Sequence, residues 1–470
     1  MSKFSSPVVI GLEIHVELAT QTKIFCRCKR EATEGEGPNT RTCPVCLGHP
    51  GSKPVFNKKV LEYALRLGLA LHCTINKELI FSRKSYFYPD LAKNYQISQY
   101  DLPLGQNGTM KISTGTIGIT RVHVEEDPAS LVHPKGMGAG YVLIDYNRSG
   151  NPLVEVVTEP DMKSPEEARE FMNKLITMLD YLEIFDIDKC IIKADANVSI
   201  KESGYVRSEI KNVTGFKEIE RALFYEVQRQ KHAVTNGEKI IQDTRSWDAD
   251  KGATTRMRTK ETEEDYGYII DPDLVAIPLD PAYVSQVKQD LPEMADEKLE
   301  KYKEEHGIKA DTAAVLAKDK VLASVFEKVS KKVNPDLAAK WIRRELPRVL
   351  NYNKKKFSDV DFTEEHLIAL LLLIQEGKIT DKVAQKILEK LCEGAFDVNS
   401  YVKNEGLETV GDSSAIEVLC KEVITEHGLV ADEVRSGNEK SINFLVGQVM
   451  KKSRGKADPK IIHEALKKLL

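Results

Sequence analysis

Alternating apolar and polar residues dominate the first part of the chain, a pattern typical of strands that bury one face. The clearest run is Val8–Leu18, in which Glu13, His15 and Glu17 lie on the polar side. Further strands are predicted at Ile117–Glu125, Gly140–Asp145, Leu153–Val157 and Lys193–Ile200. Apolar residues at helical spacing predict helices at Lys58–Leu71, Ser164–Leu182 and Lys217–Gln230, the second with Ser164 as its cap.

These elements predict three domains. Strands with inserted helices over residues 1–291 are typical of an α+β fold, here built on a mixed sheet. After the proline-rich stretch Asp271–Pro281 the alternation stops, and helical spacing predicts an all-α domain over residues 292–402. Small and polar residues cluster at Asn399–Gly411, so residues 403–470 are predicted to form a separate, small all-α tail.

Charge and hydropathy narrow the class of protein. The 470 residues carry a net charge of -4, which excludes a generic polybasic nucleic-acid binder but not a local basic surface. No apolar stretch approaches the roughly 18 residues of a membrane span. The first residues, Met1–Pro7, lack the hydrophobic region of a signal peptide, so we predict a cytoplasmic protein without membrane association.

Four of the eight cysteines are close in sequence, as Cys26-x-Cys28 and, after fourteen intervening residues, Cys43-x-x-Cys46. Two thiolate pairs joined by a loop suit tetrahedral zinc, and four protein ligands leave no open position, so the predicted zinc knuckle is structural. Four unliganded thiols are the alternative. A redox Cys-x-x-Cys is less favoured because no thioredoxin-like βαβ context surrounds it.

The acids are distributed over several predicted strands. Glu13 and His15 lie on the first strand, Glu155 interrupts an apolar run, and Asp195 lies on the last strand. If these strands share a sheet, carboxylates and an imidazole converge in a cleft that suits Mg²⁺ or Mn²⁺. A solvated sheet face is the alternative, although a single acid in an apolar run, as at Glu155, usually has a partner.

The end of the strand Ile117–Glu125 leaves one choice open. Strand parity places Glu125 with His123 and Glu126 on the opposite face, but the last residues of a strand often leave the register. Both glutamates therefore stay candidates.

The segment Ser82–Asp90 combines Arg83 and Lys84 with three aromatic residues. The cations could hold phosphates and the aromatics could stack on a base, or the aromatics could be core and the cations surface. The sequence has no Walker-type Gly-x4-Gly-Lys-Ser/Thr loop, and Gly136–Gly140 is not a dinucleotide fingerprint. A nucleotide would bind outside the two commonest architectures.

Many motifs in a fixed order resemble the GatB family, the B subunits of aspartyl/glutamyl-tRNA amidotransferases. The resemblance covers essentially the whole chain. It rests on Gly11–Leu18, Pro38–Thr40, Cys43–Gly48, Lys84–Asp90, Tyr95–Gln99, His123–Asp127, Asn151–Glu155, Asp195–Ser199, Glu209–Asn212, Arg229–Gln230, Thr244–Arg245, Asp271–Leu274 and Phe444–Met450.

The resemblance implies a cradle domain, a helical domain and a YqeY-like tail that reaches tRNA. It also implies a two-step reaction, in which ATP and Mg²⁺ phosphorylate the side-chain carboxylate of misacylated Asp-tRNA(Asn) or Glu-tRNA(Gln), and ammonia then gives Asn-tRNA or Gln-tRNA. A partner amidase, the A subunit, releases the ammonia from glutamine, and a small C subunit completes a heterotrimer.

The resemblance also suggests roles for single residues. The metal-binding positions of the family map onto His15, Glu126 and Glu155, with Glu13, Glu125 and Asp195 nearby. Arg83 and Lys84 are the cations we expect to hold phosphate. In the tail, where residues 440–470 hold eight Lys or Arg against two acids, the candidate tRNA-binding residues are Lys451, Lys452, Arg454 and Lys456. A solvated helix end is the alternative for this run.

Two segments depart from the bacterial pattern of the family: Asp186–Cys190, and Gly267 with Ile269 and Ile270. They predict an archaeal-type or otherwise divergent member. Two other functions stay open, a non-catalytic tRNA-docking scaffold with the same fold and a metal-dependent hydrolase. The hydrolase would need no basic tail, and the scaffold would need none of the retained residues His15, Glu126, Glu155 and Asp195.

Overall fold

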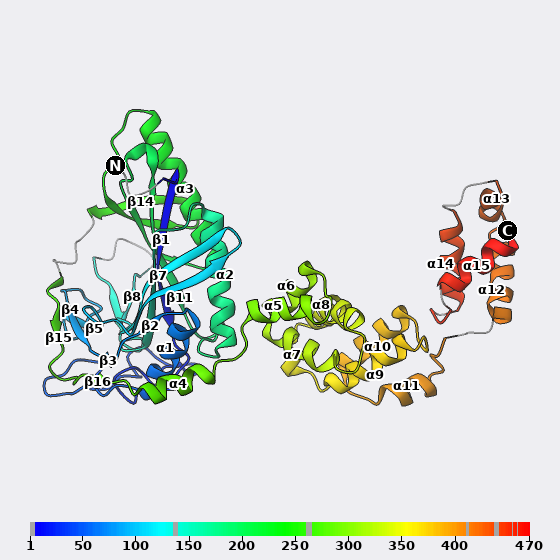
Figure 1. Cartoon of the computed structure of the whole chain (residues 1–470), viewed down its shortest axis with the longest axis horizontal. Coiled ribbons are helices and arrows are strands. Elements are labelled where there is room, and N and C mark those ends of the chain that lie inside the picture. The colour runs from blue at the N-terminus through cyan, green and yellow to red at the C-terminus, as the bar shows by residue number, and fades with distance from the viewer. Residues whose placement is uncertain are drawn as a thin grey trace. The chain divides into compact units, whose positions relative to one another are not determined.

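The computed structural model describes residues 5–134, 140–259, 266–409, 413–436, 441–453, 455–457 and 459–470. The chain divides into two compact units, Met1–Pro292 and Glu293–Leu470 (Figure 1). The first unit is built on a mixed sheet with helices and the second is helical, which confirms the predicted order of an α+β part followed by all-α residues. Among the described residues, none of the helices is both long enough and apolar enough to cross a bilayer.

A nine-stranded sheet organises the first unit, in the order β14-β13-β12-β11-β1-β10-β7-β6-β2. Neighbouring strands are antiparallel except for the parallel pair β12 and β13. The strands are β1 (Val8–Glu17), β2 (Thr74–Ile75), β6 (Gly105–Ile112), β7 (Gly115–Glu126), β10 (Pro152–Thr158), β11 (Ile192–Ile200), β12 (Ser208–Thr214), β13 (Asp243–Asp248) and β14 (Ala253–Thr259).

Strand β1 lies in the middle of this sheet, and its two-residue alternation gives it one apolar face and one polar face. Ile10, Leu12, Ile14 and Val16 are at most 1% exposed. Helix α2 (Pro165–Tyr181) contacts β1, and α3 (Phe216–Thr235) contacts β11, so these helices cover the apolar face. Ser164 caps α2 as predicted, accepting a hydrogen bond from the Glu167 amide. The polar face of β1 is therefore not covered by these two helices.

Short strands form three small sheets beside the large one. They are β3 (Glu78–Leu79) with β16 (Ile277–Pro278), β4 (Ser82–Ser85) with β5 (Tyr95–Ser98) and β15 (Ile269–Ile270), and β8 (Ser130–Val132) with β9 (Leu143–Asp145). The strand predicted at Gly140–Asp145 is thus shorter than expected and lies outside the main sheet, since its only described partner is β8. Helices α1 (Lys58–Ala70) and α4 (Pro281–Gln289) complete the unit.

The second unit consists of helices and one short 3-10 turn in its described residues. The helices are α5 (Ala295–Glu304), α6 (Ala310–Lys318), α7 (Lys320–Val329), α8 (Pro335–Tyr352), α9 (Glu364–Gln375), α10 (Asp381–Glu393), α11 (Val398–Asn404), α12 (Ser413–Glu426), α13 (Gly428–Arg435), α14 (Ile442–Lys452) and α15 (Pro459–Leu469). The domain limits at residues 291 and 402 stay predictions, since the two-unit division does not separate the tail.

Candidate active site

Pairing between strands brings two histidines and two glutamates together on the polar face of the sheet. On β1, His15 lies directly opposite Glu155 of β10, which lies opposite His123 of β7. His15 Nε2 is 3.5 Å from carboxylate oxygens of both Glu125 and Glu155, and His123 Nε2 is 3.1 Å from Glu155 Oε2. We call His15, His123, Glu125 and Glu155 the His15 cluster.

His123, Glu125 and Glu155 are buried and His15 is half-buried, and the charges within this cluster determine the pKa values of its members. Burial disfavours the imidazolium of His123, but the carboxylates of Glu155 and Glu125 outweigh it and raise its pKa to about 9. The same carboxylates raise the pKa of His15 against the effect of burial. Burial works in the opposite direction on the acids, yet the histidines hold the pKa of Glu155 and of Glu125 below the ordinary value. Both carboxylates are therefore ionised at neutral pH.

The donor set of this cluster fits a divalent cation. One atom each of His15, Glu125 and Glu155 lie within 4.8 Å of one another. Two carboxylates and one imidazole are ligands that Mg²⁺ and Mn²⁺ accept. The hydroxyl of Ser98 donates to Glu125 Oε2 at 3.1 Å, so the glutamate is oriented by a second residue. The Nδ1 atom of His123 is buried and has no hydrogen-bond partner among the residues that the structure describes.

Glu126 lies outside this cluster, so the structure does not bring the predicted set of His15, Glu126 and Glu155 together, and the choice of metal ligand at this position stays a prediction. Its carboxylate binds Lys93 Nζ at 2.6 and 2.7 Å and accepts the Ile97 amide at 2.8 Å. It lines a separate cavity of about 260 Å³ that also contacts Cys46 and Arg83. Parity holds to the end of β7, so Glu125 faces His15 and Glu126 faces away.

A second acidic group continues the polar face on the other side of β1. Oxygens of Glu13, Asp195 and Glu209 lie within 4.8 Å of one another, and we call these residues the Glu13 cluster. Lys211 Nζ bridges Asp195 at 2.7 Å and Glu209 at 3.1 Å. Burial disfavours the ammonium, but these two acids raise the pKa of Lys211 above its ordinary value.

Glu209 and Lys211 were not predicted as site residues. The sequence Ser208–Lys211 alternates, which could have indicated a further strand with Glu209 and Lys211 on one face. The alternation does not say that β12 lies beside β11, and that neighbour relation makes the pair part of the site.

Arg83 and Lys84 lie on β4, in one of the small sheets beside the large one. Arg83 forms ion pairs with Asp271 at 2.8 Å and Asp273 at 3.1 Å, and its guanidinium lies 4.3 Å from the ring centre of Tyr95. The ammonium of Lys84 lies over Tyr266 at 4.7 Å. Phosphate binding by these two cations stays a prediction, and for Arg83 it would have to compete with two carboxylates.

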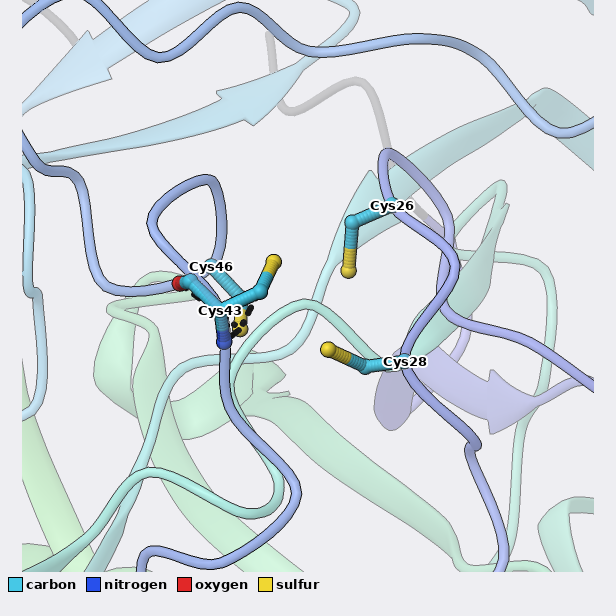
Figure 2. Close-up of side chains that lie close together, drawn as sticks. All are labelled: Cys26, Cys28, Cys43 and Cys46. Carbon is cyan, nitrogen blue, oxygen red and sulfur yellow. Dashed lines mark hydrogen bonds between the residues drawn. The ribbon is translucent and has the colours of Figure 1, made fainter.

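The four cysteines converge from two loops, as Figure 2 shows. The sulfur atoms of these residues all lie within 4.8 Å of one another; the residues are Cys26, Cys28, Cys43 and Cys46. A hydrogen bond from Cys26 and the nearby ammonium of Lys23 outweigh burial and lower the pKa of Cys46 to about 4. The same hydrogen bond raises the pKa of Cys26, so the two sulfurs share one proton between them.

The cysteine loop is tied to the active face through its backbone. Ile24 donates its amide to the Gly150 carbonyl at 2.9 Å, and Gly150 lies just before β10, the strand that carries Glu155. On the other side, the loop continues directly from β1, the strand of Glu13 and His15. The four-cysteine site therefore links the two central strands of the His15 cluster.

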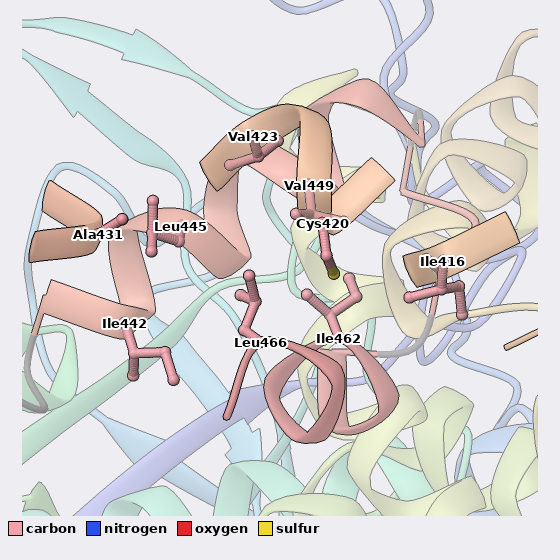
Figure 3. Close-up of a cluster of buried hydrophobic side chains, with 10 residues drawn as sticks. Ile416, Cys420, Val423, Ala431, Ile442, Leu445, Val449, Ile462 and Leu466 are labelled. Atoms are coloured by element: carbon pink, nitrogen blue, oxygen red, sulfur yellow. The ribbon is translucent and has the colours of Figure 1, made fainter. Parts of the chain in front are cut away.

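The C-terminal helices share a small apolar core. Its labelled members in Figure 3 come from all four helices of the segment: Ile416, Cys420, Val423, Ala431, Ile442, Leu445, Val449, Ile462 and Leu466. Lys451 and Lys452 end α14, and Lys452 is paired with Glu422 at 2.9 Å and Glu426 at 2.6 Å. Lys456 follows α14, whereas Arg454 lies outside the described residues.

Two family models match most of the chain. The model described as the GatB/GatE catalytic domain matches residues 8–285, and the one described as the GatB domain matches residues 324–470. The first contains both acidic clusters and all four clustered cysteines, and the second contains the basic run of the tail.

Curated relatives match over almost their full length. The B subunit of the aspartyl/glutamyl-tRNA(Asn/Gln) amidotransferase of Moorella thermoacetica is 42% identical, over 98% of this chain and 99% of its own. The corresponding subunit of Carboxydothermus hydrogenoformans is 41% identical over 98% of each chain, and that of Brevibacillus brevis is 40% identical over the whole chain and 99% of its own. These relatives are bacterial, so they do not support the archaeal-type alternative.

The raised pKa of His123 predicts how stability depends on pH. Its folded-state pKa of about 9 exceeds the roughly 6.5 of an unfolded histidine, so protonation stabilises the fold below pH ~6.5, and this contribution is lost as the pH rises through 9. Without added divalent cations, the free energy of unfolding of the first unit should fall by up to about 3 kcal/mol over that range.

The measurement is urea denaturation at several pH values, followed by Trp247 fluorescence with Trp341→Phe as the background. His123→Gln should flatten the decline between pH 6.5 and 9.5, whereas His232→Gln, on the exposed face of α3, should keep it. Equal slopes for wild type and His123→Gln would contradict the assigned charge.

Proposed function

The chain belongs to the GatB family, and we propose that it activates and amidates misacylated tRNA as the B subunit of an aspartyl/glutamyl-tRNA amidotransferase. The substrate is Asp-tRNA(Asn), Glu-tRNA(Gln) or both. An oxygen of the side-chain carboxylate attacks the γ-phosphorus of ATP, and ADP leaves. The nitrogen of ammonia then attacks the acyl carbon, and inorganic phosphate leaves with that oxygen. The observation that carries the proposal is the His15 cluster at the centre of the large sheet.

His15, Glu125 and Glu155 are the residues we propose for Mg²⁺. When bound, Mg²⁺ would neutralise charge on the phosphoryl oxygens, the main requirement in this class of reaction. His123, 3.1 Å from Glu155, would hold that carboxylate in place. Glu13 and Asp195, with Glu209, offer three further carboxylates within reach of the same substrate and would take a second cation once Lys211 moves aside.

For the four cysteines we propose a structural zinc ion. Two thiol pairs from separate loops give the tetrahedral donor set without an open position. Their backbone links to β1 and to Gly150 suggest that zinc fixes the strands of the active face and takes no part in the chemistry.

Membership of the family supports a proposal for the remaining partners. We propose an amidase A subunit that supplies ammonia from glutamine and a small C subunit, acting together with this chain in the cytoplasm. The tail would contact tRNA through Lys451, Lys452, Arg454 and Lys456. Lys452 is paired with two glutamates, so its contribution requires that phosphates displace them.

Two rival functions are less favoured. A tRNA-docking scaffold would not need a cluster in which two ionised glutamates and one of two histidines are buried, which is costly to keep without a ligand. A metal-dependent hydrolase would not need a tRNA-binding tail. ATP consumption that depends on misacylated tRNA distinguishes the three functions.

Glu155→Gln removes one carboxylate from the proposed magnesium site and keeps the side-chain shape. In the assembled complex we expect kcat for ATP-dependent amidation to fall at least ~100-fold, because the charge that stabilises phosphoryl transfer is lost. Glu166→Gln, on the exposed first turn of α2, is the control and should keep full activity. Unchanged activity of Glu155→Gln with normal folding would rule out the metal assignment.

Cys43→Ser tests the zinc site. The variant should lose one zinc per chain by elemental analysis and melt at a lower temperature, with activity falling only as a consequence. Cys73→Ser alters a buried cysteine outside the cluster and should keep its zinc. A Cys43 variant with no zinc and the thermal stability of the wild type would count against a structural role.

Deletion of the residues from about 400 onward tests the tail. Lost phosphate contacts weaken tRNA binding more than chemistry, so KM for tRNA should rise by a larger factor than kcat falls. Steady-state kinetics of the complex on each misacylated tRNA measure both. A fall in kcat at unchanged KM would place the tail's role in catalysis instead.

A further inference from the structure

Most cations around the acidic clusters are already bound to carboxylates. Lys211 pairs with Asp195, Arg30 with Glu17, Lys93 with Glu126, and Arg148 with Asp127, at 2.7, 3.2, 2.6 and 3.3 Å in that order. Arg121 of β7 and Lys193 of β11 differ. Each is half-buried, and neither side chain forms a hydrogen bond or an ion pair with any residue in the described part of the chain.

Both cations lie on the polar face. Arg121 is two residues before His123 on β7, so strand alternation directs it to the same side. On β11, Lys193 alternates with Ala194 and Ala196, which are fully buried on the helix side. The face of the two cations is therefore that of His15 and Glu155.

The register places the two cations on opposite sides of the His15 cluster. Lys193 pairs with His15, so Lys193, His15, Glu155 and His123 form one row across four strands. Arg121 pairs with Val157, which pairs with Glu13 in the next row. The strands of the two cations are three strand spacings apart, about 14 Å. Two extended side chains can converge over the cluster from that distance.

The field of Arg121 reaches the His15 cluster, and that of Lys193 reaches Asp127 just beyond the end of β7, although the side-chain donors of both are unused. Arg121 helps to lower the pKa of Glu155, and Lys193 helps to counter the effect of burial on the pKa of Asp127. A half-buried cation without a hydrogen-bonded partner is a cost that proteins usually compensate with an anion. The anion in question would lie beside the carboxylates proposed for Mg²⁺ and would pair with two cationic side chains. A polyphosphate carries enough negative charge for both.

We propose that Arg121 and Lys193 bind the phosphate chain of the nucleoside triphosphate from the two sides of the His15 cluster. The planar guanidinium of Arg121 suits two oxygens of one phosphate, and the ammonium of Lys193 acts as a point charge on another. The inference rests on the proposed function, because it takes the triphosphate from the kinase step. It places phosphate binding on the large sheet instead of on β4, where Arg83 was expected to bind phosphate. Arg83 is paired with Asp271 and Asp273.

The test is equilibrium binding to the assembled complex in the presence of Mg²⁺. A non-hydrolysable ATP analogue and adenosine are titrated into wild type, Arg121→Gln, Lys193→Gln and Arg121→Lys. Each Gln variant should bind the analogue roughly tenfold or more weakly, the effect of one lost hydrogen bond to a charged group. Affinity for adenosine should not change, which shows that the nucleoside site and the fold are intact. Arg121→Lys should recover part of the loss.

Two controls separate this role from others. Lys111→Gln removes an exposed lysine from β6 of the same sheet and should leave analogue binding unchanged. Binding of misacylated tRNA is measured in parallel and should stay within about twofold, since a tRNA backbone contact would instead weaken it in the Gln variants.

The outcomes are distinguishable. Gln variants that bind the analogue as tightly as wild type, or that lose tRNA or adenosine in its place, would overturn the assignment of Arg121 and Lys193. If the wild-type complex itself does not bind the analogue, the proposed function fails, whatever the variants do.

Discussion

Strand β1 cannot shift its register by one residue, and the rest of the first unit depends on this constraint. A shift would turn Ile10, Leu12 and Ile14 toward solvent and move Glu13 and His15 against the helices. Both outcomes are costly. Exposed apolar side chains lose the free energy of their burial, and charges buried without partners pay a large desolvation penalty. The alternation of one ten-residue strand therefore fixes which side of the nine-stranded sheet is core and which carries charge.

From this strand the site extends in both directions through pairing alone. On one side, β10 and β7 bring Glu155, His123 and Glu125 to His15, and on the other, β11 and β12 bring Asp195 and Glu209 to Glu13. The antiparallel register sets the spacing, so no long loop has to position a ligand. The cysteine loop connects two of these strands, since it continues from the end of β1 and donates the Ile24 amide to the Gly150 carbonyl just before β10.

Sequence reasoning identified β1, β7, β10 and β11, because β1 and β11 alternate clearly and because the single acid Glu155 in the apolar run of β10 required a partner, but it did not predict β12. It identified the cysteine cluster from spacing and the family from ordered motifs. It could not choose between Glu125 and Glu126, because parity is uncertain at the end of a strand, and the contacts of Glu126 with Lys93 and the Ile97 amide, which favour Glu125, are tertiary. It missed the pairing of Glu209 and Lys211 with Asp195, because strand order is a tertiary property that no local pattern carries.

The central claim is that the divalent cation lies on the polar face of β1, against His15, Glu125 and Glu155. Anomalous diffraction from crystals of this chain grown or soaked with Mn²⁺ tests it most directly. The account predicts a manganese peak within coordination distance of the His15 imidazole and of both carboxylates. A peak at Glu126 beside Lys93, with none at the His15 cluster, would contradict it.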